Sequence, residues 1–345
     1  MNPPDAQSEL FGHERAEARL LAALGSGRFP PAWLLAGPQG IGKATLAFRL
    51  ARRLLAHGAG PADTLAMAAD HPVFRQVANG AHPDLTVLEL PRDAKTGRQK
   101  SEIPVAAVRD AIERLHVTGV GSGFRVVLVD PAEAMNANAA NALLKLLEEP
   151  PPRAVLLLVS HRPSAVLPTL RSRCARLRLL PLSADAAAAA LLRLEPTLEP
   201  VTAALLADFA DGRIGRALAL HATGELDLYR RVLGVLADTR AGAAKLDGLA
   251  DDLARMAAGH GLARVASLLQ TLPARAVRQA QGRLPSVGPA DEARLLEAWR
   301  GGRPLDRCAA LWDNAARLAR AADALHLDAG HVIRRLLGEF AAAPA

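Results

Sequence analysis

The sequence predicts an α/β domain with a parallel sheet, followed by a region built only of helices. Up to about residue 180, short aliphatic and β-branched runs alternate with amphipathic helical stretches, a pattern typical of parallel sheets. A glycine-rich loop joins the first of these runs to a helix. From Ser183 onward no strand-like run occurs, and helical periodicity continues instead.

The elements of the α/β region follow one another in a regular order. The first strand, 32–35, leads into the glycine-rich loop, and a helix over 43–55 carries its leucines on one stripe. The later strands are apolar without alternation, as in sheets that are covered on both faces. The expected later strands are 84–90, 125–130 and 154–160, and the expected later helices are 104–115 and 132–147.

Two further features of this region can be predicted. The helix over 132–147 is apolar on one face, and its inward residues are expected to be Met135, Ala139, Ala142 and Leu146. The stretches 58–80 and 93–101 are polar or rich in small residues. We expect both stretches to be surface insertions.

The helical region is expected to divide into a small lid, whose first helix Ser183 can cap, and a C-terminal collar. Breaks are expected at Pro273, around 285–289 and at 301–302. The collar is expected to mediate oligomerisation, and the helix over 328–340 is the best candidate for this contact. Its apolar face consists of Ile333, Leu336, Leu337 and Phe340. The expected domains are 1–182, 183–224 and 225–345.

Composition narrows the class of protein. The net charge of +7 fits work near DNA, although a GC-rich genome would produce the same excess of arginine. Only two cysteines occur, which argues for a reducing cytoplasm and against a disulfide framework. The first ten residues contain Asp5 and Glu9 and do not resemble a signal peptide. Because the apolar runs are too short to span a membrane, we expect a cytoplasmic protein.

The glycine-rich loop is expected to bind phosphate. Closely spaced glycines let backbone N–H groups surround phosphate oxygens at a helix N-terminus, and a lysine adds a point charge. The usual Mg²⁺-binding hydroxyl is missing, because Ala44 follows the lysine; Thr45 lies one step further and is expected to touch an inner phosphate at most. The expected phosphate-binding residues are Gly37, Pro38, Gly40, Ile41, Gly42, Lys43 and Thr45.

The strand over 125–130 ends with an acid that suits the same site. Asp130 is expected to steady a magnesium ion through water, and a glutamate beside it would normally orient the attacking water. Pro131 occupies that place, and Glu133 lies two residues further on, where a helix is expected. A site without the hydroxyl and without the water-positioning acid is predicted to hydrolyse ATP slowly or not at all.

Several motifs together resemble bacterial clamp-loader subunits of the AAA+ class. The strongest is the run Asn138–Pro151, with the sequence NAANALLKLLEEPP. Leu170–Cys174, Gly12-His13-Glu14 and His82–Leu85 match in order and spacing. The resemblance covers about residues 10–180 and implies an AAA+ phosphate-loop domain, a helical lid and a collar.

The resemblance also implies a function, namely membership of a multi-subunit, ATP-driven machine that places a sliding clamp on primed DNA. Because its own site is incomplete, this chain is expected to be a largely non-hydrolysing partner of gamma/tau-like motor subunits and a delta-like subunit. Arg173 is expected to act in trans on a neighbour's ATP, with Arg171 as a competitor for this role and a surface salt bridge as the structural alternative. Ser160 and Arg216 match the positions of two sensors, although Ser160 could simply cap a strand and Arg216 could simply lie on a helix surface.

The same resemblance bears on cofactors. Many members carry cysteines that bind a structural zinc in the segment corresponding to 58–80, and this segment has none. His57, His71 and His82 are poor substitutes without thiolates, so no zinc is expected. Whether ATP binds to the loop is a question that the sequence leaves open.

Two other functions compete with this interpretation. The first is an ATP-hydrolysing clamp-loader motor, against which Ala44 and Pro131 argue. The second is an unrelated phosphate-loop enzyme such as a nucleotide kinase, which would need an intact Mg²⁺ ligand and would leave the run Asn138–Pro151 unexplained.

Overall fold

The computed structural model describes residues 3–92, 100–116, 123–238, 243–282, 292–293, 295–297, 299, 305–325 and 327–341. The chain forms two compact units. Unit 1 comprises Met1–Leu198 and Ala210–Arg216, and unit 2 comprises Glu199–Phe209 and Ala217–Ala345. Most of the insertion predicted at 93–101 and the breaks predicted at 285–289 and 301–302 lie outside the described residues. The boundaries of the lid and collar stay predictions.

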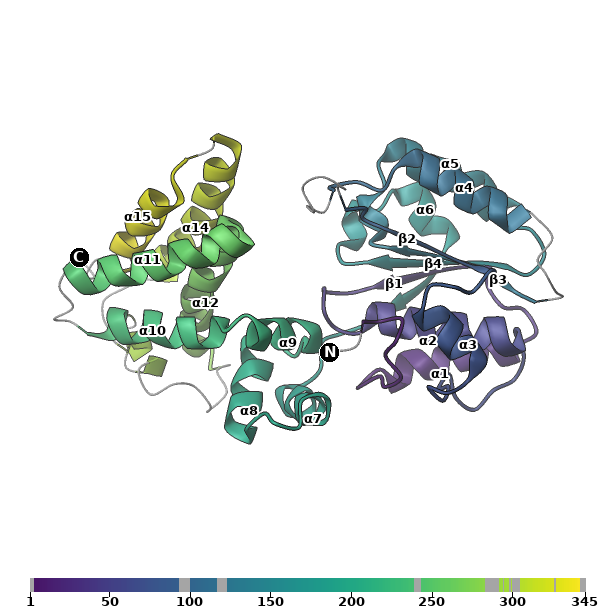
Figure 1. Cartoon of the computed structure of the whole chain (residues 1–345), viewed down its shortest axis with the longest axis horizontal. Coiled ribbons are helices and arrows are strands. Elements are labelled where there is room, and N and C mark those ends of the chain that lie inside the picture. Colours follow the sequence, from purple (N-terminus) through teal and green to yellow (C-terminus); the bar gives the residue numbers. More distant parts are fainter. Residues whose placement is uncertain are drawn as a thin grey trace. The chain divides into compact units, whose positions relative to one another are not determined.

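Unit 1 is built on a parallel five-stranded sheet with the order β2-β3-β4-β1-β5 (Figure 1). The predicted strands are confirmed, and the edge strand β5 was not predicted. Because the strands are parallel, their carboxyl ends lie along one edge of the sheet, where ligands bind in such folds. The strands are β1 (Ala32–Ala36), β2 (Leu85–Glu89), β3 (Arg125–Asp130), β4 (Ala154–Ser160) and β5 (Ala175–Arg178).

Helices cover both faces of this sheet, as Figure 1 shows. Alternate residues of β1 enter opposite cores, since Trp33 packs with the first group of helices and Leu34 with the second. This double cover explains why the strands are apolar throughout and confirms the α/β fold class. The first group is α1 (Glu14–Gly25), α2 (Lys43–His57) and α3 (Pro72–Ala78); the second is α4 (Val105–His116), α5 (Ala137–Glu148) and α6 (Pro168–Arg173).

The helix predicted over 132–147 is wrong in its first part. A 3-10 turn, η1 (Ala132–Ala134), is followed by an extended residue, Met135. Helix α5 begins only after Asn136, whose side chain accepts a hydrogen bond from the Ala139 N–H at 3.0 Å and so caps the helix. The strong capping preference of asparagine therefore outweighs the continuous apolar periodicity.

The inward face predicted for this segment is partly confirmed. Met135, Ala139 and Leu146 are buried. Leu143 is also buried, whereas Ala142 is only half-buried. The face is rotated because α5 starts at its own cap rather than continuing from η1.

The segment 58–80, predicted as a surface insertion, contributes to the core. Leu65, Phe74 and Val77 are buried. The Leu65 N–H donates to the Glu17 carboxylate at 3.0 Å, and the Phe74 ring lies 4.2 Å from the Arg52 guanidinium carbon. Three isolated apolar residues among polar ones gave too little periodicity to be recognised.

The rest of the described chain is helical, and among the described residues no strand follows β5. Helix α7 begins after Ser183, whose hydroxyl accepts from the Ala186 N–H at 3.3 Å, as predicted. The helices are α7 (Ala184–Leu194), α8 (Pro200–Phe209), α9 (Ile214–Ala222), α10 (Glu225–Ala237), α11 (Ala243–His260), α12 (Leu262–Ala280), α14 (Leu305–Leu325) and α15 (Ala329–Ala341).

Two sequence predictions for unit 2 are wrong. Pro273 does not break a helix but lies buried inside α12. A proline costs a helix one hydrogen bond, and the packing of α12 against α14 offsets this cost. The apolar face of α15 is not open for oligomerisation, because Ile333, Leu336, Leu337 and Phe340 are buried within unit 2, where α15 packs on α11.

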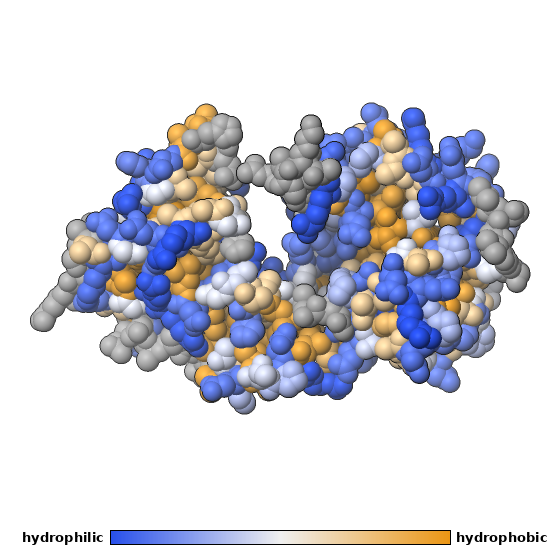
Figure 2. Space-filling model, in the orientation of Figure 1, coloured by the Kyte–Doolittle hydropathy of each residue, from blue (hydrophilic) through white to orange (hydrophobic). Residues whose placement is uncertain are grey.

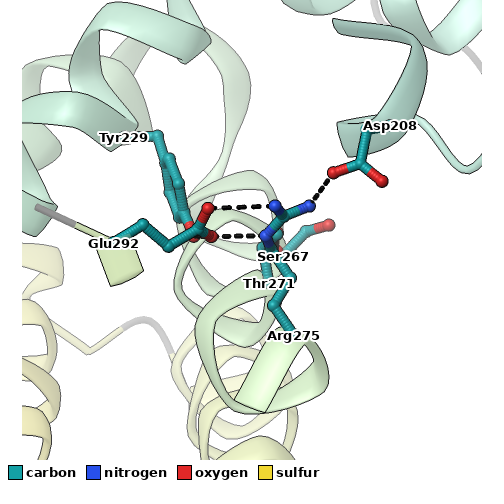
Figure 3. A network of polar contacts seen from close by, with 6 residues as sticks. All are labelled: Asp208, Tyr229, Ser267, Thr271, Arg275 and Glu292. Atoms are coloured by element: carbon teal, nitrogen blue, oxygen red, sulfur yellow. Dashed lines mark hydrogen bonds and ion pairs between the residues drawn. The ribbon is translucent and has the colours of Figure 1, made fainter. Parts of the chain in front are cut away.

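A group of buried charged residues, here called the Arg275 cluster, joins elements of unit 2 (Figure 3). It consists of Asp208, Tyr229, Arg275 and Glu292. The Arg275 guanidinium donates to both carboxylate oxygens of Glu292 and to Asp208, and the Tyr229 hydroxyl donates to Glu292 at 2.7 Å. Burial alone would lower the pKa of Arg275, but these carboxylates outweigh it and raise the pKa.

Hydrophilic residues cover much of the face seen in Figure 2, with apolar residues between them on both units. Within the described residues, no helix combines the length and the apolar character needed to cross a membrane. Of the residues that the structure describes, the large apolar side chains that stay exposed are Leu180, Val201, Trp312, Leu325 and Leu327.

Candidate phosphate-binding site

The predicted phosphate loop lies between β1 and α2, at the carboxyl edge of the sheet. Gly40 and Gly42 have φ values of 81° and 98°, which favour glycine. At Gly37 a side chain would collide with the Leu179 carbonyl oxygen, only 2.4 Å from an ideal Cβ. The loop therefore depends on its glycines for both conformation and close packing.

Lys43 opens α2 and is buried, with 3% of its surface exposed. Its ammonium donates to the Pro38 carbonyl oxygen of the same loop at 2.5 Å. Burial lowers the pKa of Lys43 to about 8, against the attraction of Asp130 and Glu133. At neutral pH Lys43 is thus a cation that is shielded from solvent. A bound phosphate would stabilise its charge.

Asp130 ends β3 beside this lysine. Burial raises the pKa of Asp130 to about 6, although Lys43 opposes the shift. The His161 Nε2 lies 3.8 Å from the Asp130 Oδ1. Among the described residues, Asp130 Oδ1 and His161 Nδ1 are buried atoms without a hydrogen-bond partner. Buried polar atoms of this kind call for an explanation, such as a bound ligand or an ordered water.

Glu133 was predicted to lie on a helix, but it lies in the 3-10 turn η1. Its Oε1 accepts hydrogen bonds from the backbone N–H groups of His161 and Arg162, at 2.9 and 3.0 Å. Burial favours the neutral carboxyl, but hydrogen bonds that include the one from His161 outweigh it and lower the pKa of Glu133. This carboxylate therefore fixes the chain after β4. Pro131 is joined to Asp130 by a cis peptide bond. It occupies the position of the water-orienting glutamate and has no carboxylate.

The remaining predicted residues of the site lie around the loop. Ser160 ends β4 and is fully buried, and Thr45 is half-buried in the first turn of α2. The Gly215 N–H donates to the Gly40 carbonyl oxygen at 2.8 Å, and the backbone nitrogen of Arg216 lies 2.9 Å from where a Gly40 Cβ would be. The start of α9 thus borders the phosphate loop within unit 1, and the backbone of Arg216 lies next to Gly40.

Two histidines of the site were not assigned a role from the sequence. His13 is buried under the loop, and its Nε2 forms a hydrogen bond with the Ile41 carbonyl oxygen at 2.5 Å. Burial lowers the pKa of His13 and of His161. The Gly12-His13-Glu14 motif was the available signal for His13, whereas only the position after Ser160 pointed to His161.

Arg173 is not part of this site and belongs to α6. Its guanidinium donates to the Glu148 carboxylate at 2.8 Å and to the Thr169 carbonyl oxygen at 3.2 Å, while its side chain stays 39% exposed. The competing Arg171 is more buried and donates to the Pro163 carbonyl oxygen at 3.0 Å. Arg173 is therefore the more accessible of the two.

The donor set of the site fits phosphate better than it fits a magnesium–phosphate complex. Backbone N–H groups of the loop and the Lys43 ammonium suit a nucleotide's phosphates, whereas an ionised Asp130 only accepts hydrogen bonds and suits magnesium-bound water. Ala44 offers no hydroxyl to a magnesium ion. Among the described residues, no group of three or more histidine, cysteine, aspartate or glutamate side chains is arranged to hold a metal.

Comparison with known proteins identifies the family. Residues 12–183 match the family model described as DNA polymerase III, delta subunit. Through these residues, the chain belongs to this family. The match begins at the Gly12-His13-Glu14 motif and ends at Ser183, so it includes β1 to β5, the phosphate loop and α6.

Individual relatives agree with the family. A DNA polymerase III subunit delta' from Pseudomonas aeruginosa is 47% identical over 143 residues, which cover 41% of each chain. A subunit delta' from Bacillus subtilis is 30% identical over 57% of this chain and 56% of that protein. A subunit gamma/tau from Mycobacterium bovis is 34% identical over 49% of this chain and 28% of that protein. The chain thus spans about half or less of the length of these relatives.

Proposed function

We propose that the chain is a delta-prime-like subunit of the DNA polymerase III clamp loader. In this role it helps to load the sliding clamp on primed DNA in the cytoplasm as a largely non-hydrolysing partner. It completes an ATP site of a neighbouring motor subunit with Arg173. The observation that carries the proposal is the contrast between a retained phosphate loop and the acid next to it, Glu133, which is bound to the backbone after β4.

The chain's own site supports the non-hydrolysing part of this role. Hydrolysis needs an acid that orients the attacking water and a hydroxyl that holds magnesium. Pro131 and Ala44 supply neither, and Glu133 would have to leave two backbone N–H groups to serve as a base. ATP can still bind to the loop through its phosphates, without being turned over.

Arg173 suits the trans-acting role because of its place and its exposure. The buried Leu170 fixes α6, and Arg173 in the last turn stays accessible to another subunit. A guanidinium brought to a neighbour's γ-phosphate offsets charge that develops in the transition state. In GTPases such an arginine is worth about 10³ to 10⁵ in rate.

The partners proposed are gamma/tau-like motor subunits and a delta-like subunit, with the clamp and primed DNA reached through the complex. The names of the relatives, subunit delta' and subunit gamma/tau, support the gamma/tau-like partner. Unit 2 would supply the oligomerisation collar, through surfaces other than the buried face of α15.

The test is ATP turnover by the reconstituted loader, with clamp and primed DNA, carrying Arg173→Ala. We expect turnover at the interface that this chain completes to fall at least about 100-fold, with assembly intact by size-exclusion chromatography. Arg19→Ala is the control, because Arg19 is exposed on α1, on the other face of the sheet. Unchanged turnover in the Arg173 variant would refute the trans-acting role.

The alternative function is an ATP-hydrolysing motor subunit, which the gamma/tau relative and the retained Lys43 favour. The two functions differ in one property of the purified chain. A motor would turn over ATP at its own loop, whereas the proposed partner would not. Turnover that Lys43→Ala abolishes, measured on the chain alone, would favour the motor.

A further inference from the structure

Arg173 is held by acceptors of its own chain. The terminal nitrogens of its guanidinium donate to two different groups, the Thr169 carbonyl oxygen in the same helix and the Glu148 carboxylate. Both bonds lie within unit 1. The side chain is therefore oriented before any neighbour is met, although it is 39% exposed.

Neither the helix nor the core explains the position of Glu148. It is the last residue of α5, and a carboxylate at a helix C-terminus is disfavoured by the helix dipole. Its side chain is 53% exposed, so it does not fill the core. The cation of Arg173 is the group that makes a carboxylate favourable at this position.

The geometry of a guanidinium lets it keep these bonds and still bind a phosphate. Arginine carries more N–H donors than the two bonds to Thr169 and Glu148 use, and the donors lie in one rigid plane. Because both terminal nitrogens are each held by one bond, the remaining N–H groups are fixed in direction. A long side chain that is already oriented loses less conformational entropy when it meets its target.

We propose that Glu148 is a positioning residue, which orients the Arg173 guanidinium for the phosphate of a neighbouring subunit. This inference rests on the proposed function of Arg173. A carboxylate could also act in the opposite sense, by neutralising the arginine and holding it back. The two effects change turnover in opposite directions, so the sign of the effect decides between them.

The experiment uses the reconstituted loader and a readout that isolates this arginine. Arg173-dependent turnover is defined as the ATP turnover of the wild-type assembly minus that of the Arg173→Ala assembly. We expect Glu148→Ala to lower it about 3- to 5-fold, which is the upper range for an exposed ion pair, and to lower kcat with KM unchanged. Glu148→Gln keeps an acceptor oxygen, so its Arg173-dependent turnover should stay within about 2-fold of wild type. The reason is that hydrogen bonding rather than charge orients the Arg173 guanidinium.

Two controls separate positioning from structural damage. Glu149→Ala changes the next residue, an exposed glutamate that follows α5, and should leave turnover unchanged. Combining Glu148→Ala with Arg173→Ala should give no further loss beyond Arg173→Ala, because Glu148 acts through that arginine.

The outcomes distinguish this inference from the function on which it rests. If Arg173→Ala removes no turnover, the trans-acting role fails and the positioning role fails with it. If Arg173→Ala removes turnover while Glu148→Ala leaves it unchanged or raises it, the proposed function stands and Glu148 is not a positioning residue. An additional loss in the double variant would likewise overturn the inference.

Discussion

Two groups of buried charge, the Arg275 cluster and the residues around Lys43, differ in how completely their polar atoms are bonded. In the Arg275 cluster of unit 2, the guanidinium binds Glu292 and Asp208, and Tyr229 binds the same glutamate. Around Lys43 in unit 1, Asp130 Oδ1 is buried without a hydrogen-bond partner among the described residues, and the lysine turns to its own loop. The first group is complete in itself, whereas the second leaves a buried oxygen of Asp130 without a partner in the described part of the chain.

This difference shows how to separate structural charges from functional ones. A buried charge costs several kcal/mol unless it is paired or hydrogen-bonded, so a charge that is only partly bonded needs a compensating interaction. The Arg275 cluster raises the pKa of Tyr229, through burial and Glu292, and keeps the group locked in one protonation state. Near Lys43, burial moves the pKa values of Lys43 and Asp130 toward neutrality, to about 8 and about 6. The first arrangement stabilises unit 2, and the second suits a phosphate site.

The largest expected effect is a loss of stability on disrupting the Arg275 cluster. Arg275→Met should lower the free energy of unfolding of unit 2 by about 3–5 kcal/mol, because it leaves Asp208 and Glu292 as buried carboxylates without a cation. Denaturant unfolding measures this loss. The control is Arg230→Ala, which breaks an exposed pair with Asp227 on α10 and should cost less than about 1 kcal/mol. Equal effects of the two variants would remove the contrast between the clusters.

The second largest expected effect is on Glu133, which lies beside the phosphate site but binds backbone N–H groups. Glu133→Ala should destabilise unit 1 by about 1.5–3 kcal/mol, because the N–H groups of His161 and Arg162 lose a charged acceptor. Glu113→Ala, on the exposed side of α4, is the matched control and should change stability by less than about 0.5 kcal/mol. A normal stability of the Glu133 variant would mean that this carboxylate is free for another role.

The smallest effect has the opposite sign and tests the incomplete group. Burial raises the pKa of Asp130 from 3.8 to about 6, so the folded state favours the neutral carboxyl. Stability from this preference is fully present below pH 3.8 and is lost as the pH rises through about 6. Asp130→Asn stays neutral and should therefore be more stable than wild type at pH 7.5, by about 1–2 kcal/mol.

The pH dependence of that difference is the decisive measurement. The advantage of Asp130→Asn should disappear when unfolding is repeated at pH 4, where the wild-type carboxyl is neutral in the folded state. Asp110→Asn, exposed on α4, should show no such trend. A variant that is less stable than wild type at pH 7.5 would show that Asp130 is a structural charge like those of the Arg275 cluster.

Much of unit 1 could be predicted from sequence because its signals are local. A buried strand is a continuous apolar run, and the phosphate loop is a fixed spacing of glycines before a lysine, so β3, β4 and the loop were placed correctly. The edge strand β5 escaped because Arg176 and Arg178 interrupt its apolar residues. The helix expected through Asn136 failed because one cap outweighed a periodic pattern.

What the sequence could not provide were contacts between distant residues. The bond from Glu133 to the backbone after β4 spans 28 residues, and the bond from Arg173 to Glu148 spans 25. The Arg275 cluster joins residues from α8, α10 and α12 to Glu292, none of which carries a motif. Similarly, the apolar face of α15 looked like an interface because periodicity marks a buried face without saying what buries it.

The central claim is that this chain contributes to a neighbour's ATP site and not to turnover at its own. The direct test compares Lys43→Ala with Arg173→Ala in the same reconstituted loader, by ATP turnover with clamp and primed DNA. We predict that Arg173→Ala removes at least the share of one ATP site, whereas Lys43→Ala changes total turnover by less than about 2-fold, since a site without the water-positioning acid and the magnesium hydroxyl contributes little turnover. A large loss in the Lys43 variant with little loss in the Arg173 variant would contradict this account and identify the chain as a motor.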